Sequence, residues 1–472
     1  MSVINIEKAG KQSSNQTQTT CAALFIAAPA SGQGKTTVTA ALARYFSHQG
    51  KRVRVFKTGP DYLDPQILAQ ASGYPTQQLD LWMAGEQYCR QMLFEAACDA
   101  DLILIEGAMG LFDGEPSSAD LAATFGIPIA IVMDVKGMAQ TAAAVALGLA
   151  NYRDDYHCAG LIANNCSTER HAQLIRDALG GDLPLLAALA KEPEVALPER
   201  HLGLVQASEV TQELEQRFES GCLWLEQGVV RAATGAALLQ LSETVVFKAA
   251  KVEPVTIEPL KGKTIAIARD VAFSFIYQAN IELLQKLGAQ VSFFSPLQDR
   301  EMPAADALWL PGGYPELHTA ALSDNQAMLN SIRDFHHQQK PILAECGGFL
   351  YCLSGLTDLQ GEFFPLLGIM PGEGGMRGKR GCQGMQTAML PEGEVRGHAH
   401  HRSRSSGTTA AIGYGRRQRH PAPGEAIFRE GNLTASYLHL FFASNPEVIG
   451  RLFNGQLAEP DNEFLQHWVA SA

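Results

Sequence analysis

The sequence predicts an α/β protein built from two doubly wound domains, and three observations lead to this prediction. Short apolar runs alternate with helical stretches along most of the chain. Strands that are buried on both faces are apolar throughout, so this alternation predicts parallel sheets with helices on both sides. The alternation stops near residue 250 and then restarts, and 472 residues are enough for more than one buried core.

Five apolar runs in the first half are predicted to form one parallel sheet. The helix after the first run is expected at residues 35–50, where the helical stretch ends at a glycine. Residues 180–250 are less regular, and we expect them to be mainly helical and to complete this domain. The five predicted strands are 22–29, 52–57, 101–107, 127–134 and 158–165.

A linker separates the two predicted domains. Residues 250–262, AKVEPVTIEPLKG, combine two prolines with mixed charge and show no helical period. Four apolar runs after this segment predict a second sheet, at 263–270, 290–296, 307–313 and 341–346. The chain is therefore divided into a disordered tail (1–20), a first α/β domain (21–245), a linker (246–262) and a second α/β domain (263–472).

The composition excludes several classes of protein. A formal net charge of −12 argues against a general nucleic-acid-binding protein, and the basic run GRRQRH at 415–420 is expected to be a solvated loop. The sequence contains no run of about 18 apolar residues, so we expect no membrane span. The first twenty residues are polar, unlike a signal peptide, and the nine cysteines include no Cys-x-x-Cys pair. These features favour a reducing, cytoplasmic location.

The segment 28–37, APASGQGKTT, follows the first predicted strand and opens the first helix, which is the context of a phosphate-binding loop. Its glycines let backbone N–H groups approach phosphate oxygens, its lysine can reach the outer phosphates, and a threonine hydroxyl can bind Mg²⁺. Pro29 stands where the motif usually has its first glycine. The alternative interpretation of the segment is a glycine-rich turn with a surface lysine. The residues expected to bind ATP are Gly32, Gly34, Lys35, Thr36 and Thr37.

Acidic residues follow two other predicted strands of the first domain. Glu106 ends a buried strand, at the sheet edge where ligands bind, and can coordinate Mg²⁺ directly or through water. A helix or turn cap is the alternative role for this residue. Asp61 and Asp64 flank Tyr62 in KTGPDYLDP (57–65), which follows the second strand and reaches the same edge. Turn formation is the alternative role for the two aspartates.

Cys346 stands between the apolar run PILAE and two glycines, at the expected exit of a buried strand. A thiol attacks well only as a thiolate, so this residue needs a helix N-terminus or a basic partner to be a nucleophile. Gly312 and Gly313 follow another strand and can offer N–H donors to an oxyanion. His439 is the candidate base, although a histidine among Leu and Phe is more often a core residue. The rival histidines in RGHAHHRSR (396–404) are expected on an exposed binding loop.

These features point to acyl transfer from an amide in the second domain and to ATP-driven activation in the first. One reaction joins the two: glutamine is hydrolysed, and its ammonia passes to a carboxylate that ATP has converted into an acyl phosphate. The first domain also resembles partition-type regulatory ATPases. An ATP-switched binding protein with an inactive second domain is therefore the alternative from another class.

Six motifs, SGQGKTT, GPDYLDP, EGAMGLFDG, PGGYPE, AECGGF and SYLHLFFASNP, together resemble the cobyrinic acid (or hydrogenobyrinic acid) a,c-diamide synthase family. They span residues 28–446. The resemblance implies a P-loop, dethiobiotin-synthetase-like ATPase domain followed by a class I glutamine amidotransferase-like domain. It implies that ATP, Mg²⁺ and L-glutamine serve to amidate the a and c carboxylates of a corrinoid in cobalamin biosynthesis. No nucleic-acid or membrane partner is expected, and a homodimer is the assembly to be tested.

The resemblance also implies roles for individual residues. Cys346 would be the nucleophile, and His439 would raise its nucleophilicity. Asn164, in GLIANN, matches an asparagine that reads adenine in dethiobiotin-synthetase-like enzymes. The remaining roles are phosphate and Mg²⁺ binding by Lys35 and Thr36, a further metal ligand in Glu106, and substrate contacts by Asp61, Tyr62 and Asp64.

The chain departs from these patterns in two places. Class I amidotransferases place a glutamate two residues after the histidine, where this chain has Phe441, so the resemblance implies a Cys–His dyad. A motif that usually reads Gly-His-Glu-Phe-His has Ala399 and His400 in its centre, which leaves no assigned role for His398 or His401. Cobyric acid synthase and a sirohydrochlorin-type a,c-diamide synthase are near alternatives. The sequence does not distinguish a cobalt-containing from a cobalt-free ring.

Overall fold

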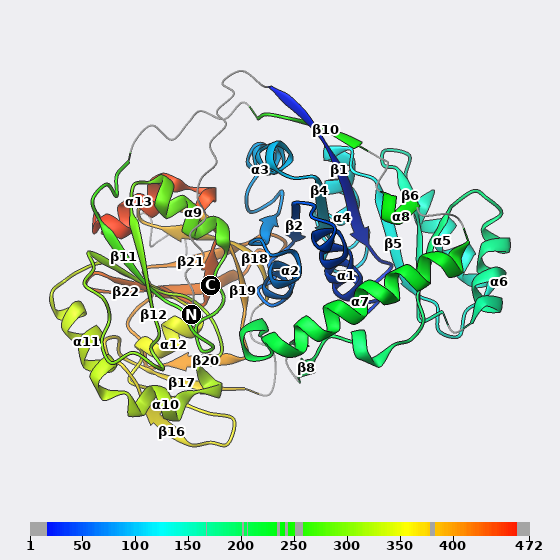
Figure 1. The fold of residues 1–472 in the computed structure, drawn as a ribbon. Coiled ribbons are helices and arrows are strands. Elements are labelled where there is room, and N and C mark those ends of the chain that lie inside the picture. Colours follow the sequence, from blue (N-terminus) through cyan, green and yellow to red (C-terminus); the bar gives the residue numbers. More distant parts are fainter. Residues whose placement is uncertain are drawn as a thin grey trace.

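The computed structural model describes residues 17–166, 168–200, 203–204, 206–233, 237–240, 244–250, 258–377 and 383–459. Two α/β domains lie side by side, each built on its own large sheet (Figure 1). The predicted α/β class with two domains is confirmed.

The sheet of the first domain runs in the order β3-β2-β4-β1-β5-β6-β7, and all of these pairs are parallel. A last strand, β10, pairs antiparallel with the first residues of β1. Because the strands are parallel, the segments that follow β1, β2 and β4 meet at one edge of the sheet. The strands are β1 (Gln18–Ala27), β2 (Val53–Thr58), β3 (Gln77–Leu79), β4 (Leu102–Glu106), β5 (Ile129–Asp134), β6 (Cys158–Asn164), β7 (Leu185–Ala188) and β10 (Thr244–Lys248).

Helices cover both faces of this sheet, as the continuous apolar strands predicted. One buried cluster joins the sheet to α3, α4, α5 and α6, and a second joins its other face to α1, α2 and α7. The long α7 runs along the outside of α1 (Figure 1). The helices are α1 (Lys35–His48), α2 (Asp64–Ser72), α3 (Glu86–Asp99), α4 (Ser118–Phe125), α5 (Gln140–Ala150), α6 (Glu169–Leu179), α7 (Thr211–Ala232) and α8 (Ala237–Gln240), with short elements η1 (Pro193–Val195), β8 (Glu199–Arg200), β9 (Gly203–Leu204) and η2 (Ala207–Glu209).

The large sheet of the second domain is parallel in one half and antiparallel in the other. Its order is β12-β11-β13-β14-β23-β22-β21-β18-β19-β24, and the strands from β12 to β23 are parallel. The strands are β11 (Thr264–Ala268), β12 (Gln290–Phe294), β13 (Ala307–Leu310), β14 (Ile342–Glu345), β18 (Gln383–Leu390), β19 (Gly393–His400), β21 (Gly413–Arg417), β22 (Pro423–Glu430), β23 (Leu433–Ser436) and β24 (Leu438–Leu440).

Smaller elements complete the second domain. A four-stranded sheet contains β15 (Gly355–Thr357), β16 (Phe363–Pro365), β17 (Glu373–Met376) and β20 (Ser403–Ser406). The helices are α9 (Gln278–Lys286), α10 (Thr319–Asp324), α11 (Gln326–His337), α12 (Gly347–Cys352) and α13 (Pro446–Asn454), with η3 (Pro315–Leu317) and η4 (Phe442–Ser444).

Several details differ from the expectations. Residues 18–20 of the expected tail belong to β1, and residues 246–248 of the expected linker belong to β10, because these two strands pair with each other. The stretch 180–250 contains β7 and β10 as well as α7. Residues 396–404 are not an exposed loop: they lie mostly in β19 and β20, where ladder hydrogen bonds hold them. The rest of the expected tail (1–16), most of the linker (251–257) and residues 460–472 lie outside the described residues.

The two domains meet through a small apolar cluster and several hydrogen bonds. Tyr277 and Phe441 of the second domain pack with Met83 of the first. The hydroxyl group of Tyr62 donates to that of Tyr277 over 2.7 Å, and Gln77 donates to Glu282 over 2.6 Å. In the described part of the chain, no helix has the length and apolar character needed to cross a bilayer.

Candidate functional site

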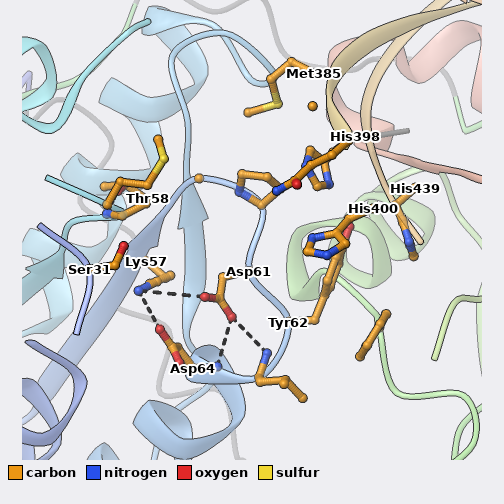
Figure 2. A pocket seen from close by; sticks show the side chains of 18 of the residues that line it. Ser31, Lys57, Thr58, Asp61, Tyr62, Asp64, Met385, His398, His400 and His439 are labelled. Carbon is orange, nitrogen blue, oxygen red and sulfur yellow. Dashed lines mark hydrogen bonds and ion pairs between the residues drawn. The ribbon is translucent and has the colours of Figure 1, made fainter. Parts of the chain in front are cut away.

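One cavity of about 1200 Å³ lies between the two domains and joins both predicted sites. Figure 2 shows Ser31, Lys57 and Thr58 on one side of it, facing His398 and His439 on the other. The predicted site residues that line the cavity are Gly32, Gly34, Lys35, Thr36, Thr37, Asp61, Tyr62, Asp64, Glu106, Gly313, Cys346 and His439. Gly312 and Asn164 lie just behind the wall, against residues of the site.

The loop after β1 has the backbone of a phosphate-binding loop. Gly32 and Gly34 have φ values of 76° and 95°, which favour glycine. A Cβ atom on Gly34 would lie 2.4 Å from the Asn164 amide nitrogen, which donates to the carbonyl of Gln33 over 3.0 Å. Asn164 therefore braces the loop from β6, and its predicted contact with adenine stays a prediction.

The Lys35 side chain folds back over the loop. Its ammonium group donates to the carbonyl oxygens of Met109, over 2.7 Å, and Ala30, over 3.2 Å. Burial, followed by the nearby charge of Lys57, lowers the pKa of Lys35 to about 8. Because carbonyl groups are its hydrogen-bond acceptors here, this amine is available to an incoming phosphate.

Lys57, which the sequence reasoning passed over, lies at the centre of the acidic residues. Its ammonium nitrogen is 2.5 Å from Glu106 Oε1, 2.7 Å from Asp64 Oδ2 and 3.9 Å from Asp61 Oδ2. Burial alone lowers the pKa of Lys57, but the carboxylates outweigh it and raise the pKa above its usual value. The register of β2 against β4 places Lys57 directly beside Glu106, a pairing that the local sequence does not show.

Thr36 connects the loop to this cluster. Its hydroxyl group donates to Glu106 over 2.9 Å and to Asp64 over 3.3 Å. Burial raises the pKa of the Glu106 carboxyl, and the ammonium of Lys57 partly offsets this effect. The second Glu106 oxygen, Oε2, is buried and has no hydrogen-bond partner among the described residues. An unpaired buried oxygen beside a threonine hydroxyl suits a hard cation.

Asp61 and Asp64 have different surroundings. Asp61 accepts hydrogen bonds from the backbone N–H groups of Leu63 and Asp64, each over 3.0 Å, so it forms the turn that the alternative interpretation described. Burial, followed by the charge of Asp64, raises the pKa of Asp61 to about 7. Asp64 begins α2 and directs its carboxylate to Lys57 and Thr36.

Cys346 occupies a sharp turn between β14 and α12. Its φ of 46° and ψ of −101° form a strained conformation for a residue with a side chain. A Cβ atom on Gly348 would lie 2.0 Å from the Leu310 carbonyl oxygen, so the turn cannot form without this glycine. Burial, followed by the charge of Glu316, raises the pKa of the Cys346 thiol well above its usual value. The side chain is therefore a thiol until a base takes its proton.

His439 lies on β24, fully buried except where it lines the cavity. Burial, followed by the charge of His398, lowers its pKa well below the usual value, so the imidazole is neutral. Neither ring nitrogen has a hydrogen-bond partner among the described residues. Tyr62, from the first domain, lies against the imidazole with ring centroids 4.9 Å apart. His439 and Cys346 line the same cavity, and a neutral imidazole with both ring nitrogens unpaired can act as a general base once a thiol comes within hydrogen-bond reach.

The two candidate oxyanion glycines have different positions. Gly313 lines the cavity, and its backbone nitrogen would lie 3.0 Å from a Cβ atom on Gly347, directly over the turn after Cys346. Gly312 instead packs on the base: a Cβ atom there would lie 2.2 Å from His439 Cε1. Gly313 is thus placed to donate to an oxyanion, and Gly312 makes room for the imidazole.

No acid occupies the position two residues after His439, since Phe441 is buried against Tyr88 and Tyr277. A buried acid from the neighbouring strand supports this region instead. Glu345, directly before Cys346, accepts from the Leu440 backbone N–H over 2.8 Å and from the Trp309 indole over 3.0 Å. Glu345 therefore holds β24 against β14 and fixes the position of His439. The sequence signal was a glutamate inside the buried run ILAE.

Comparisons with known proteins agree with this geometry. A family model described as a CobQ/CobB/MinD/ParA nucleotide binding domain matches residues 24–205, and a CobB/CobQ-like glutamine amidotransferase domain matches residues 264–447. A hydrogenobyrinate a,c-diamide synthase from Stutzerimonas stutzeri is 50% identical over 91% of this chain and 98% of its own length. One from Pseudomonas aeruginosa is 48% identical over 92% and 98%, and a cobyrinate a,c-diamide synthase from Herminiimonas arsenicoxydans is 47% identical over 92% and 97%.

Two solved structures resemble parts of the chain. A glutamine amidotransferase matches 40% of this chain and 98% of its own, with 15% identity and a TM-score of 0.30. The septum site-determining protein MinD from Pyrococcus horikoshii, solved with Mg-ADP, matches 46% of this chain and 96% of its own, with 19% identity and a TM-score of 0.31.

Proposed function

Because the chain belongs to the family of cobyrinate and hydrogenobyrinate a,c-diamide synthases, we propose that it amidates the a and c carboxylates of a corrinoid acid, with ATP as the energy source and glutamine as the nitrogen donor. The reaction makes it a carbon–nitrogen ligase of cobalamin biosynthesis. The observation that carries the proposal is the single cavity in which the phosphate-binding loop faces Cys346 and His439.

The first domain activates the substrate carboxylate. The backbone N–H groups around Gly32 and Gly34 bind the phosphates of ATP, and Lys35 leaves its carbonyl acceptors to bind the outer phosphates. A substrate carboxylate then attacks the γ-phosphorus, the bond to the bridging oxygen breaks, and an acyl phosphate and ADP form. Phosphate is a far better leaving group than oxide, so the acyl carbon becomes open to ammonia.

The residues of this domain fit Mg²⁺. Thr36, Asp64 and Glu106 supply hard oxygen donors, and the unpaired Oε2 atom of Glu106 can accept a ligand without losing a hydrogen bond. The described residues hold no ready-made group of three or more His, Cys, Asp or Glu for a metal, so phosphate oxygens and water would complete the coordination. When bound, Mg²⁺ neutralises charge on the transferring phosphoryl group. Lys57 keeps the two carboxylates oriented toward the loop.

The second domain releases ammonia from glutamine. The Cys346 sulfur attacks the side-chain amide carbon while its proton moves to the neutral imidazole of His439. The N–H group of Gly313 donates to the oxyanion, a contact whose loss typically costs about 3–4 kcal/mol of transition-state stabilisation. The imidazolium then protonates the leaving nitrogen, and water hydrolyses the thioester to glutamate. Ammonia crosses the cavity to the acyl phosphate and displaces phosphate.

Substitution of Cys346 by serine tests this division of labour. We expect Cys346→Ser to lose glutamine-dependent amidation and to keep amidation with added ammonium, because activation of the carboxylate does not use the thiol. The measurement is product mass with cobyrinic and with hydrogenobyrinic acid, where each amidation lowers the mass by about 1 Da. Loss of both activities in a folded variant would refute the assignment. The acid that the unchanged protein amidates twice also identifies the ring substrate.

The cellular location, the assembly and the macromolecular partners of the chain stay predictions. The eight cysteines that the structure describes are all free, which agrees with a reducing, cytoplasmic location. The homodimer and the absence of a nucleic-acid partner stay predictions as well. Light scattering of the purified chain measures its assembly directly.

A further inference from the structure

The part of the cavity wall that the second domain contributes is rich in basic side chains. Arg377 follows β17, Arg402 precedes β20, and Arg417 and Arg419 lie at and after the end of β21. His398, on β19, also lines the cavity, and Figure 2 shows it across from Ser31 and Lys57. We call these five residues the basic wall. All of them except Arg377 belong to the two stretches, 396–404 and 415–420, that the sequence analysis had expected to be exposed or solvated loops.

Charge is divided between the two sides of the cavity. Among the described residues that line it, all arginines belong to the second domain, whereas the carboxylates other than Glu316 belong to the first. The carboxylates of the first domain are already compensated in part by Lys57. Among the described residues, the acid that pairs with an arginine of the basic wall is Glu115, which contacts Arg419, so the wall keeps a positive charge that attracts an anionic ligand.

Most of the basic wall lacks partners within the protein. The guanidinium groups of Arg377, Arg402 and Arg417 donate no hydrogen bond to any described residue, and the Nε atom of Arg417 is buried. His398 is 5% exposed, and its Nδ1 atom has no partner among the described residues. Arg419 pairs with Glu115 across the domains at 3.1 Å, but both side chains are more than half exposed. Unpaired buried donors are costly, so a ligand that accepts from them is favoured.

The wall results from strand alternation. Arg416 and Arg417 are adjacent on β21, and successive side chains point to opposite faces of a sheet. Arg416 pairs with Glu394 at 2.9 Å and does not line the cavity. Arg417 turns into the cavity and has no such partner. The two neighbours therefore form a natural pair of test and control positions.

The known small ligands do not account for these cations. The phosphates of ATP are served by the loop amides and Lys35, which belong to the first domain. Glutamine carries one α-carboxylate, and Arg402, whose charge also acts on Tyr314 beside Cys346, is enough for it. Arg377, Arg417 and His398 remain, besides Arg419, which pairs with Glu115.

We propose that the basic wall is the binding site for the peripheral carboxylates of the corrinoid substrate. The proposal rests on the proposed function and adds the surface that recognises the substrate. A guanidinium group binds a carboxylate through two parallel hydrogen bonds, and several such groups spread over β17 and β21 suit a large acid with many carboxylates around a ring. A ring held by this wall presents its opposite edge to Lys35 and Thr36, where a carboxylate is activated. The substrate contacts expected of Asp61, Tyr62 and Asp64 stay a prediction.

Equilibrium binding of cobyrinic acid to the full-length chain tests the proposal, because dialysis with detection of the corrin chromophore needs no turnover. We expect Arg417→Gln and Arg377→Gln each to raise the Kd for cobyrinic acid about tenfold, the usual effect of losing one charge-assisted hydrogen bond. Arg416→Gln is the matched control and leaves the Kd within twofold. Binding to the unchanged chain weakens as salt rises, and each variant weakens less steeply.

The outcomes separate this proposal from the proposed function. If both variants bind cobyrinic and hydrogenobyrinic acid as the unchanged chain does, or if the unchanged chain binds neither acid, the basic wall is not the substrate site. A rise in the KM for ATP in place of the rise in Kd would assign these arginines to phosphates and overturn the proposal. If binding depends on Arg417 and Arg377 but the unchanged chain forms no amide, the proposed function fails and the binding site stands.

Discussion

Replacement of Lys57 by methionine examines the centre of the first site. Methionine has a similar length and no charge, so packing is kept while the carboxylates of Glu106 and Asp64 lose the ammonium at 2.5 and 2.7 Å. Lys57 is 3% exposed and Glu106 is 0% exposed, so solvent compensates poorly for the lost contact. Removal of one partner of a buried ion pair usually costs about 3–5 kcal/mol.

The magnitude and its pH dependence follow from proton uptake. Without Lys57 the folded cluster must bind one more proton, and the ordinary pKa of a glutamate is 4.5. At about 1.36 kcal/mol per pH unit, this uptake costs roughly 3.4 kcal/mol at pH 7 and roughly 0.7 kcal/mol at pH 5. Since the folded variant then holds a proton that its unfolded chain lacks, its stability relative to the unchanged protein falls as pH rises above 4.5.

Urea unfolding at pH 7 and at pH 5 measures this loss in the first domain. Lys51→Met is the control, because Lys51 is exposed and close in sequence. Equal stability of Lys57→Met and the unchanged protein at pH 7 would refute the reasoning, and so would a loss of the same size at both pH values. Added Mg²⁺ should stabilise Lys57→Met more than the unchanged protein, since its carboxylates lack a cation.

Three further predictions concern other parts of the site. Gly312→Ala should lower glutaminase activity about 100-fold, because the new Cβ atom would lie 2.2 Å from His439 Cε1 and displace the imidazole. The ammonium-dependent amidation of the same variant should be unchanged. Gly375→Ala is the control substitution, because a Cβ atom there would meet open space. The kcat/KM for ATP should fall above about pH 8, where free Lys35 loses its proton, and a flat profile to pH 9.5 would contradict this role. Burial raises the pKa of Glu345 to about 8, so the stability that its neutral form contributes is complete below pH 4.5 and is lost as pH rises through 8. Between pH 4.5 and 8, the free energy of unfolding of the unchanged protein should therefore fall by up to about 1.4 kcal/mol per pH unit relative to that of Glu345→Gln. Urea titrations at several pH values measure this difference, and the same pH dependence in both proteins would contradict it.

The sequence was sufficient to predict the parallel α/β architecture of the first domain and the loops that carry its functional residues. The central strands there, such as β1, β4 and β5, are buried over most of their length and are therefore largely apolar, which makes them visible without a partner. The expected strands at 22–29, 52–57 and 101–107 correspond to β1, β2 and β4 within a few residues. Parallel pairing then brings the following loops to one edge, so the lysine, threonines and acids of that edge could be predicted together.

The antiparallel half of the second domain was not visible in the same way. Its strands are amphipathic or only partly buried, such as β19 and β21, and their charged side chains suggested loops. Only the ladder shows that Arg417 turns into the cavity while Arg416 turns away. The register of β18, β19 and β21 depends on partners that are distant in the chain, and a single sequence does not contain that information.

By itself the sequence determined the α/β class, the phosphate-binding loop, the cysteine turn and the late histidine, because each of these is a local pattern of residue types. Only the tertiary structure decided that Lys57 stands among three carboxylates, that Glu345 supports β24 in place of an acid after His439, and that both sites open into one cavity. These facts depend on which strands pair and how the domains meet. Such contacts join residues far apart in the chain, and local pattern carries no record of them.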